Sequence, residues 1–387
     1  MPRYSTKTLL IGIFFAWLWG AGLLVFWRGS NQWLTLGGGS VLSAPTPKFD
    51  LASLRSGATA RQCEVWYNER FGLRNLAVRT DNQIYMTPFG EAPQRTEGTT
   101  VIIEPGTWLF EHHYIEHAIT PSPRPESELR AAARDIRAAQ EKLRKLGIPL
   151  LLVVAPSKAE VYPEHISPIR LGGRTPAGVL TSFERLRPFL QEEGVRYYDG
   201  PSRFAEWKVA GRPHLFAPTG THWSYDSTQE VWHDLRALLN PDLRHPIPEW
   251  PLRSRDLAHP QRDDRDLLVL LHLLNELRPV PPVPFPDIAP QTSVPADQLP
   301  RILWIHDSFG YPLIKQLYDG NAAQPSVGLY YFASAYRLPD RTPINLDIAK
   351  IRWAEFVKEY DAIVVVWTEI AADTDSWGFF KLLNGQL

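Results

Sequence analysis

The chain has 387 residues, and its 41 Lys and Arg residues nearly balance its 42 Asp and Glu residues, giving a formal net charge of −1. This balance leaves no excess of cations to neutralise phosphates and argues against a protein that works mainly by binding nucleic acid. Hydrophobic residues make up 44% of the sequence, which excludes both a wholly disordered chain and a polytopic membrane protein. The length allows two or three domains or one large α/β domain. The single cysteine, Cys63, excludes an intrachain disulfide.

The N-terminal region contains an uncharged apolar stretch over residues 8–27, TLLIGIFFAWLWGAGLLVFW. A helix of about 20 residues spans the ~30 Å hydrocarbon core of a bilayer, whereas a secretory signal has an apolar region of about 7–15 residues. Arg3 and Lys7 favour an N-terminus inside and the bulk of the chain outside. We therefore predict an uncleaved signal-anchor over residues 1–28, with a cleaved signal as the alternative. The protein is then a single-pass inner-membrane protein with its main domain in the periplasm or at the cell exterior.

Residues 29–58 are rich in Gly, Ser and Pro and are predicted to be a linker to one domain over residues 59–387. In this domain amphipathic patterns alternate with short apolar runs, which is typical of buried strands separated by helices. The pattern predicts helices over 126–146, 179–193, 225–239 and 347–360, and strands over 149–155, 195–198, 301–305 and 362–367. The predicted fold class is α/β, a mostly parallel sheet flanked by helices on both faces. The Pro-rich residues 241–300 are predicted to be an insertion or a long ordered loop.

Ser308 lies where a catalytic nucleophile is expected in such a fold. It directly follows the predicted strand 301–305 and precedes a helical pattern, YPLIKQLY, and ligands of parallel sheets bind at the carboxyl ends of strands. A serine at this turn is exposed at the sheet edge, and its own N–H lies near a helix N-terminus that stabilises an oxyanion. The alternative is that Ser308 only caps the helix.

His222 is the candidate base. It lies in the loop segment TGTHWS, just before the predicted helix 225–239. A histidine suits this task because its pKa is near neutrality, and the alternative is a histidine that only hydrogen-bonds near a helix start. Each segment is weak alone, and their occurrence together strengthens the hypothesis of a serine nucleophile activated by histidine.

Five segments in chain order resemble the AlgJ and AlgX family of alginate O-acetylation proteins, which have an SGNH-hydrolase-like domain. The most specific is VVAPSKAEVYP at 153–163, and the others are ERFGLR at 69–74, VIIEPGTWLF at 101–110, THWS at 221–224 and HDSFG at 306–310. The resemblance covers most of residues 60–370. It includes the family's permuted order, in which the His-bearing segment precedes the Ser-bearing one. Only 20 residues follow Trp367, too few for a C-terminal carbohydrate-binding module, so the chain resembles the anchored AlgJ type more than AlgX.

The resemblance implies that Ser308 is the nucleophile that carries an acetyl group and that His222 activates it. The family pattern has an Asp two residues before the His, and this chain has Gly220 there. Asp199, Asp226 or Asp307 are the candidates to replace this acid, and Asp307 joins Ser308 and His222 in the predicted catalytic set. Each of the three also has a structural alternative as a turn, first-turn or capping residue.

The function implied by the resemblance is O-acetyl transfer to an exported polysaccharide through an acetyl-serine intermediate, with no cofactor in the domain. Because acetyl-CoA is not available outside the membrane, the resemblance implies a multipass membrane acyltransferase as the acetyl donor. Two alternatives stay open. With glycine at 220, the chain is a non-catalytic polysaccharide-binding or scaffold member of an acetylation complex; with water as acceptor, it is an acetylesterase.

The remaining polar and aromatic candidates are assigned mainly to structure. Lys158 follows a strand and either contacts an anionic substrate or is structural. Trp108 and Trp223 are expected to pack, and residues 262–266, RDDRD, are expected to be a solvated charge run. We expect surface or packing roles, and no metal, for His112, His113 and His117.

Overall fold

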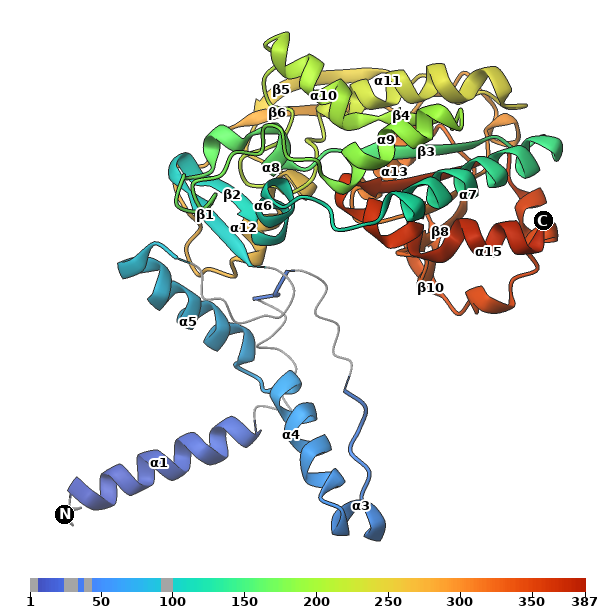
Figure 1. Ribbon diagram of the computed structural model, residues 1–387. Helices are drawn as coiled ribbons and strands as arrows, with labels where there is room; N and C mark the ends of the chain where they lie inside the picture. Colours follow the sequence, from blue (N-terminus) through green and yellow to red (C-terminus); the bar gives the residue numbers. More distant parts are fainter. Residues whose placement is uncertain (1–5, 24–33, 38–43, 92–99) are drawn as a thin grey trace. The chain divides into compact units, whose positions relative to one another are not determined.

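The computed structural model describes residues 6–23, 34–37, 44–91 and 100–387. The chain divides into two compact units (Figure 1). The first comprises Met1–Arg95 and Leu268–Leu277, and the second comprises Thr96–Leu267 and Arg278–Leu387. The catalytic candidates all belong to the second unit.

The first unit is helical. Its helices are α1 (Thr6–Leu23), α3 (Leu51–Arg55), α4 (Ala58–Arg70) and α5 (Arg74–Phe89). Segment 268–277 joins α5 through Arg79, whose Nη1 donates to the Leu273 carbonyl at 2.6 Å, and through Asn82, whose Nδ2 donates to the Leu271 carbonyl at 2.9 Å. Helix α3 lies within the predicted linker 29–58 and is capped by Asp50, whose carboxylate accepts from the Ser53 N–H at 2.8 Å.

The predicted signal-anchor falls partly outside the described residues, because residues 1–5 and 24–28 of it are not described. Helix α1 covers residues 6–23 of the predicted segment. Among the residues that the structure describes, no helix has the combination of length and apolar character needed to cross a membrane.

The second unit is built on a mixed seven-stranded sheet with strand order β10-β9-β8-β7-β11-β3-β4 among the described residues (Figure 1). Its strands are β3 (Leu150–Ala155), β4 (Tyr197–Asp199), β7 (Ile302–His306), β8 (Ser326–Tyr330), β9 (Ser334–Leu338), β10 (Thr342–Ile344) and β11 (Ala362–Thr368). The pairs from β8 through β4 are parallel, and β9 and β10 are antiparallel additions at one edge. The predicted parallel core is confirmed, but the antiparallel edge was not predicted because its short, partly polar strands lack a continuous apolar run.

Helices cover both faces of this sheet, as predicted. Successive strand side chains point to opposite faces, and Leu151, Val153 and Val364 belong to one apolar core while Leu152 and Val365 belong to the other. The first core includes α10 (Gly200–Val209), α11 (Ser227–Leu239) and α13 (Gly310–Asp319). The second includes α7 (Glu126–Lys145), α9 (Ser182–Glu192), α14 (Trp353–Phe356) and α15 (Phe379–Gln386).

One predicted helix is wrong. Residues 347–360 form three short pieces, η6 (Ile348–Lys350), α14 and η7 (Val357–Glu359), in place of one amphipathic helix. The break occurs at Ile351 and Arg352, whose ψ angles of 129° and 85° are not helical. This change of direction lets Trp353 enter the core, where it is fully buried.

Residues 241–300 have a regular structure of their own. Strand β5 (Leu252–Ala258) pairs antiparallel with β6 (Val283–Ile288), and the prolines of β6 are tolerated because the two strands form a separate ribbon with free edges. Between these strands lie η4 (Arg262–Arg265) and α12 (Asp266–Leu270). The rest of the second unit includes β1 (Val101–Glu104), β2 (Trp108–Glu111), α6 (His112–Ile119), α8 (Lys158–Val161) and η8 (Glu369–Gly378).

Candidate active site

Ser308 lies in the tight turn between β7 and α13, as predicted. The Gly310 N–H donates to the Asp307 carbonyl at 3.2 Å, and the Tyr311 N–H donates to the Ser308 carbonyl at 3.1 Å. The Ser308 side chain is half-buried at this carboxyl end of the strand. The turn therefore presents the hydroxyl at the sheet edge directly before a helix.

His222 lies beside this turn. Its ring centroid is 4.8 Å from that of Phe309, the residue after Ser308. The next residue, Trp223, donates from Nε1 to the Phe309 carbonyl at 3.1 Å. The structure thus brings together the two segments that carry the predicted nucleophile and base. The Nε2 atom of His222 is buried without a hydrogen-bond partner among the described residues.

The acid that bonds His222 is Asp266, which the sequence analysis did not identify. Asp266 Oδ2 lies 2.5 Å from His222 Nδ1. Its other oxygen, Oδ1, accepts from the N–H groups of Thr221 at 2.8 Å and Leu267 at 2.6 Å. These contacts fix the carboxylate, and its bond to Nδ1 leaves Nε2 as the ring nitrogen available for proton transfer.

The segment that carries Asp266 is not the solvated charge run that we expected. Asp264 is fully buried; its Oδ1 accepts from the Tyr225 N–H at 3.0 Å, and its carbonyl accepts from the Thr219 hydroxyl at 2.7 Å. The expectation was wrong because a run of charged residues looks polar in sequence, yet this one folds back onto the loop that precedes His222.

Gly220 explains how this segment reaches His222. A Cβ atom at position 220 would lie 2.5 Å from the Asp263 carbonyl oxygen and 3.0 Å from two backbone atoms of Asp264. Backbone atoms cannot move aside as the end of a flexible side chain can. The glycine therefore permits the close approach of residues 263–264, and an aspartate at 220 would not fit beside them.

Asp307 does not replace the missing acid, contrary to the predicted catalytic set. Its Oδ1 accepts from the Phe309 N–H at 2.9 Å, and its Oδ2 accepts from the Thr368 N–H at 2.7 Å and hydroxyl at 3.0 Å. Burial raises the pKa of Asp307 to about 6. These bonds tie the Ser308 turn to the end of β11, so Asp307 supports the backbone of this turn.

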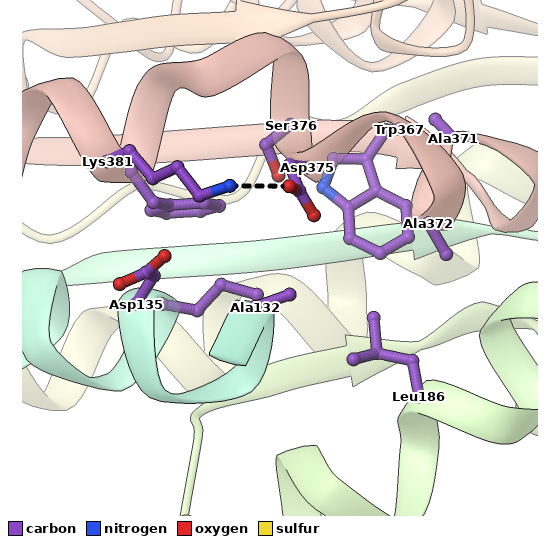
Figure 2. Close-up of a pocket in the computed structure, with 11 residues that line it drawn as sticks. Ala132, Asp135, Leu186, Trp367, Ala371, Ala372, Asp375, Ser376 and Lys381 are labelled. Atoms are coloured by element: carbon purple, nitrogen blue, oxygen red, sulfur yellow. Dashed lines mark hydrogen bonds and ion pairs between the residues drawn. The ribbon is translucent and has the colours of Figure 1, made fainter. Parts of the chain in front are cut away.

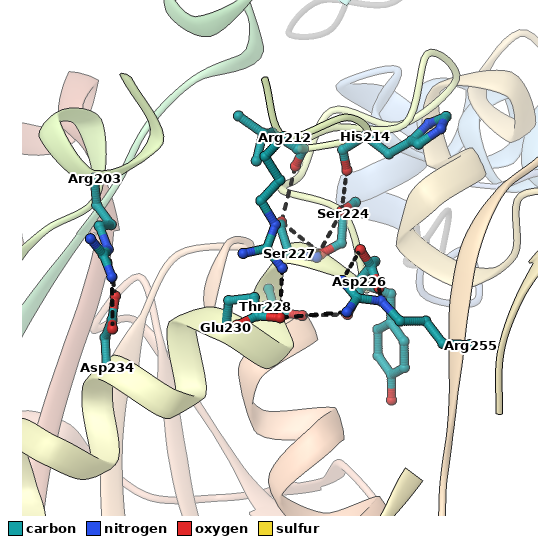
Figure 3. A network of polar contacts seen from close by, with 12 residues as sticks. Arg203, Arg212, His214, Ser224, Asp226, Ser227, Thr228, Glu230, Asp234 and Arg255 are labelled. Carbon is teal, nitrogen blue, oxygen red and sulfur yellow. Dashed lines mark hydrogen bonds and ion pairs between the residues drawn. The ribbon is translucent and has the colours of Figure 1, made fainter. Parts of the chain in front are cut away.

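The other two candidate acids also have structural partners. Asp199 caps α10 through the Ser202 N–H at 3.0 Å and pairs with Arg187 at 2.8 Å. Asp226 pairs with Arg255 through two bonds of 2.5 and 2.7 Å, within a polar network at the start of α11 (Figure 3). This network fixes the helix that directly follows the His222 segment.

The carboxylates around His222 favour its charged form. Burial alone would lower the pKa of His222, but the charges of Asp266, Asp263 and Glu111 and the hydrogen bond from Asp266 raise it to about 9. Burial raises the pKa of Glu111, against a hydrogen bond from the Thr221 side chain. The imidazole is therefore mostly protonated at neutral pH.

Lys158 also holds the loop that precedes His222. Its buried ammonium donates to the carbonyls of Pro218 at 3.1 Å, Ala217 at 3.3 Å and Gly220. Burial lowers the pKa of Lys158 to about 7. Of the two roles left open for Lys158, the structure favours the structural one, because its donors are used by backbone carbonyls.

The aromatic candidates pack as expected. Trp223 is fully buried, and half-buried Trp108 stacks on His165 with ring centroids 3.7 Å apart. His112 and His113 lie 3.4 Å from Glu116 and Glu111. Within the described ranges, no group of three or more His, Cys, Asp and Glu residues is placed to hold a metal ion.

We predict that Gly220→Ala destabilises the protein by about 1–3 kcal/mol, because the added Cβ overpacks the backbone of residues 263–264. The measurement is the free energy of unfolding in denaturant. Gly385→Ala is the matched control, because a Cβ there meets nothing within 4 Å, and in a helix alanine is favoured by up to about 1 kcal/mol. Equal effects of the two changes would contradict a tight contact at Gly220.

We also predict that the His222 imidazole titrates near pH 9 in an NMR titration, and that Asp266→Asn moves this midpoint down toward the ordinary value of 6.5. The sign follows because removing the carboxylate removes the main cause that raises the pKa, while burial still lowers it. Asp234→Asn is the control, since Asp234 pairs with Arg203 (Figure 3). A midpoint unmoved by Asp266→Asn would show that the two side chains do not interact in solution.

Comparison with known proteins places this geometry in a family. Residues 101–299 match the model described as "SGNH hydrolase-like domain, acetyltransferase AlgX"; Ser308 lies just beyond this range. "Probable alginate O-acetylase AlgJ" of Pseudomonas aeruginosa is 28% identical over 255 residues, which are 64% of this chain and 60% of the relative. The corresponding protein of Pseudomonas putida is 24% identical over 57% of this chain and 50% of its own length. The chain thus spans about half to three fifths of these relatives.

Two solved structures are also similar. The O-acetyltransferase domain of Pseudomonas putida AlgJ has a TM-score of 0.46 and 16% identity, covering 74% of this chain and 99% of that one. Pseudomonas aeruginosa AlgX has a TM-score of 0.46 and 14% identity, covering 74% of this chain and 67% of that one. Because the family model matches more than half of the residues, the chain belongs to the AlgX family of SGNH hydrolase-like domains.

Proposed function

We propose that this protein is a polysaccharide O-acetyltransferase in which Ser308 carries the acetyl group, His222 activates Ser308 and Asp266 orients His222. The observation that carries the proposal is the 2.5 Å contact between Asp266 Oδ2 and His222 Nδ1. Nε2 has no hydrogen-bond partner in the part of the chain that the structure describes, and the ring packs against Phe309. The contact between Asp266 and Nδ1 is the acid–histidine contact of a Ser-His-Asp triad. The hydrogen bond from the Ser308 hydroxyl to Nε2 is part of the proposal.

The proposed reaction has two balanced steps. In the neutral form of His222, whose population grows as the pH rises toward 9, Nε2 takes the proton of the Ser308 hydroxyl while Oγ bonds to the carbonyl carbon of an acetyl ester or thioester. The departing alcohol or thiol then takes that proton from His222. A sugar hydroxyl then loses its proton to His222 while its oxygen bonds to the acetyl carbon of acetyl-Ser308. The bond from that carbon to Ser308 Oγ breaks, and Oγ takes the proton from His222, which leaves an O-acetyl sugar and the free serine. Asp266 stabilises the imidazolium that forms in each step.

The proposed acceptor is an exported polysaccharide, and alginate is the first candidate because the relatives carry the name alginate O-acetylase. We further propose a multipass membrane acyltransferase as the acetyl donor and an inner-membrane anchor over residues 8–27 that keeps the domain at the membrane surface. The apolar sequence of that stretch supports the anchor. The reason to favour a non-catalytic scaffold was the glycine at 220, and the contact between Asp266 and His222 removes that reason.

We predict that incubating the full chain with an activated acetyl ester attaches an acetyl group to Ser308, detected by mass spectrometry of its peptide. Ser308→Ala abolishes this labelling, and Asp266→Asn slows it by up to about 10⁴-fold, as the corresponding change does in a serine-protease triad. Ser334→Ala, at an exposed serine of β9, is the control and labels normally.

The fate of the label separates the functions. Transfer to added oligosaccharide supports the transferase, while release as acetate with no transfer supports the esterase. A folded chain that binds glycan but never acquires the label would contradict the proposed enzyme and support a non-catalytic scaffold.

A further inference from the structure

Lys158 is the buried cation of the segment VVAPSKAEVYP, and the reaction described so far gives it no part. It is 3% exposed, and its ammonium donates to three backbone carbonyls within residues 217–220. By contrast, Lys381 has the usual surface arrangement of a lysine, with an exposed side chain that donates to the Asp375 carboxylate at 2.7 Å (Figure 2). An ammonium has three N–H groups and a neutral amine has two, so three carbonyl acceptors favour the charged form of Lys158. They also use every N–H group that this side chain could offer to a substrate.

The central sheet determines where this ammonium lies. Lys158 begins α8 shortly after the end of β3, and β3 lies between β11 and β4. The ammonium is 5.0 Å from the centre of the Phe110 ring and 5.8 Å from that of Trp108, within the range at which a cation is attracted to a ring face. Lys158 therefore ties the loop 217–220 to the same sheet that presents Ser308 at the end of β7.

One of the three carbonyls, that of Gly220, belongs to the same peptide unit as the Thr221 N–H. In a trans peptide these two groups point in opposite directions. The carbonyl accepts from the Lys158 ammonium, and the N–H donates to Asp266 Oδ1 at 2.8 Å. The peptide unit is thus held between a cation and a carboxylate, and a rotation of its plane that broke one of these hydrogen bonds would also break the other.

The same carboxylate contacts the candidate base, because Asp266 Oδ2 lies 2.5 Å from His222 Nδ1. A continuous series of contacts therefore runs from the Lys158 ammonium through one peptide unit and one carboxylate to the imidazole. Hydrogen bonds to charged groups are stronger than those between neutral groups, and hydrogen bonds in series polarise one another. The contact of Lys158 with the Gly220 carbonyl thus strengthens the hydrogen bond from Thr221 to Asp266.

We propose that Lys158 is a positioning residue for the acetyl transfer, which holds the peptide unit between Gly220 and Thr221 in the orientation that places Asp266 against His222. This inference rests on the proposed function. Lys158 acts through Asp266 and touches neither the acetyl donor nor the sugar, because its three N–H groups are used by the loop. Its loss therefore slows the chemical step and leaves binding of the donor unchanged.

The test measures acetylation of Ser308 in the full chain by 4-nitrophenyl acetate. Lys158→Met keeps a long unbranched side chain and removes the ammonium. We expect the maximal rate to fall about 10²-fold, the effect of displacing a reacting group by about 1 Å, with the KM for the ester nearly unchanged. Lys208→Met is the matched control and keeps the wild-type rate, since Lys208 donates to the Val161 carbonyl and to Glu164, outside the loop.

A second background separates positioning from a general loss of stability. If Lys158 acts through Asp266, adding Lys158→Met to Asp266→Asn changes the rate by no more than about 2-fold, because residues that act through one another are not additive. The same fold loss in both backgrounds would overturn the inference, and so would a loss that appears only in KM. Circular dichroism checks that the variants are folded, and Lys158→Gln replaces Lys158→Met if that variant does not fold.

An NMR measurement examines the same contacts without the reaction. At neutral pH the proton between His222 Nδ1 and Asp266 gives a downfield resonance, and we expect it to move upfield or to exchange faster with water in Lys158→Met. An unchanged resonance would overturn the positioning of Asp266 by Lys158. Absence of acetyl-Ser308 in the wild-type protein would overturn the proposed function and the role of Lys158 in it, while the resonance still reports whether Lys158 holds Asp266 against the imidazole.

Discussion

The candidate site depends on one close backbone contact, the approach of residues 263–264 to Gly220. The lack of a Cβ at 220 admits the Asp263 carbonyl, and the Thr219 hydroxyl bonds the Asp264 carbonyl at 2.7 Å. Lys158 also donates to three carbonyls of the same loop. The loop is thus fixed by two sets of contacts, and it holds the carboxylate of Asp266, 44 residues further along the chain, against the His222 ring.

The same contact places several carboxyl groups close together in a buried region. Backbone N–H groups that donate to these groups offset part of the free energy that their burial costs. Asp266 accepts from the N–H groups of Thr221 and Leu267, and a carboxylate that accepts such bonds is less costly to bury. Burial raises the pKa of Asp264 well above its usual range, which favours its neutral form. The remaining negative charge is offset by the positive charge of protonated His222, whose pKa is raised to about 9. At neutral pH the resting site therefore holds an imidazolium paired with a carboxylate, and His222 must lose this proton before it can accept the proton of Ser308 in the proposed reaction.

The sequence analysis correctly predicted the elements whose burial can be recognised from their own residues. The strands 149–155, 301–305 and 362–367 are apolar runs that only a covered sheet explains, and they placed Ser308 at a strand end. The role of Asp266 was not predicted because its neighbours resemble a solvated charge run. Local composition does not show that residues 262–266 fold onto the loop that precedes His222. The glycine at 220 was the available signal, since it marks a position where another backbone comes close. Asp307 was misassigned because adjacency in sequence to Ser308 does not reveal that its carboxylate braces the turn.

The position of Asp266 also shows which part of the proposed triad is constrained. An acid serves His222 by bonding Nδ1 and facing the charge that develops on the ring, and this requirement fixes the position of a carboxylate but not the segment that delivers it. Once residues 263–266 supply that carboxylate, position 220 must be small, so glycine there accompanies the new acid and does not signal lost chemistry. Asp307 is then free to hold the Ser308 turn against β11. Gly220 and the charged run at 262–266 are thus two parts of one packing arrangement in this chain.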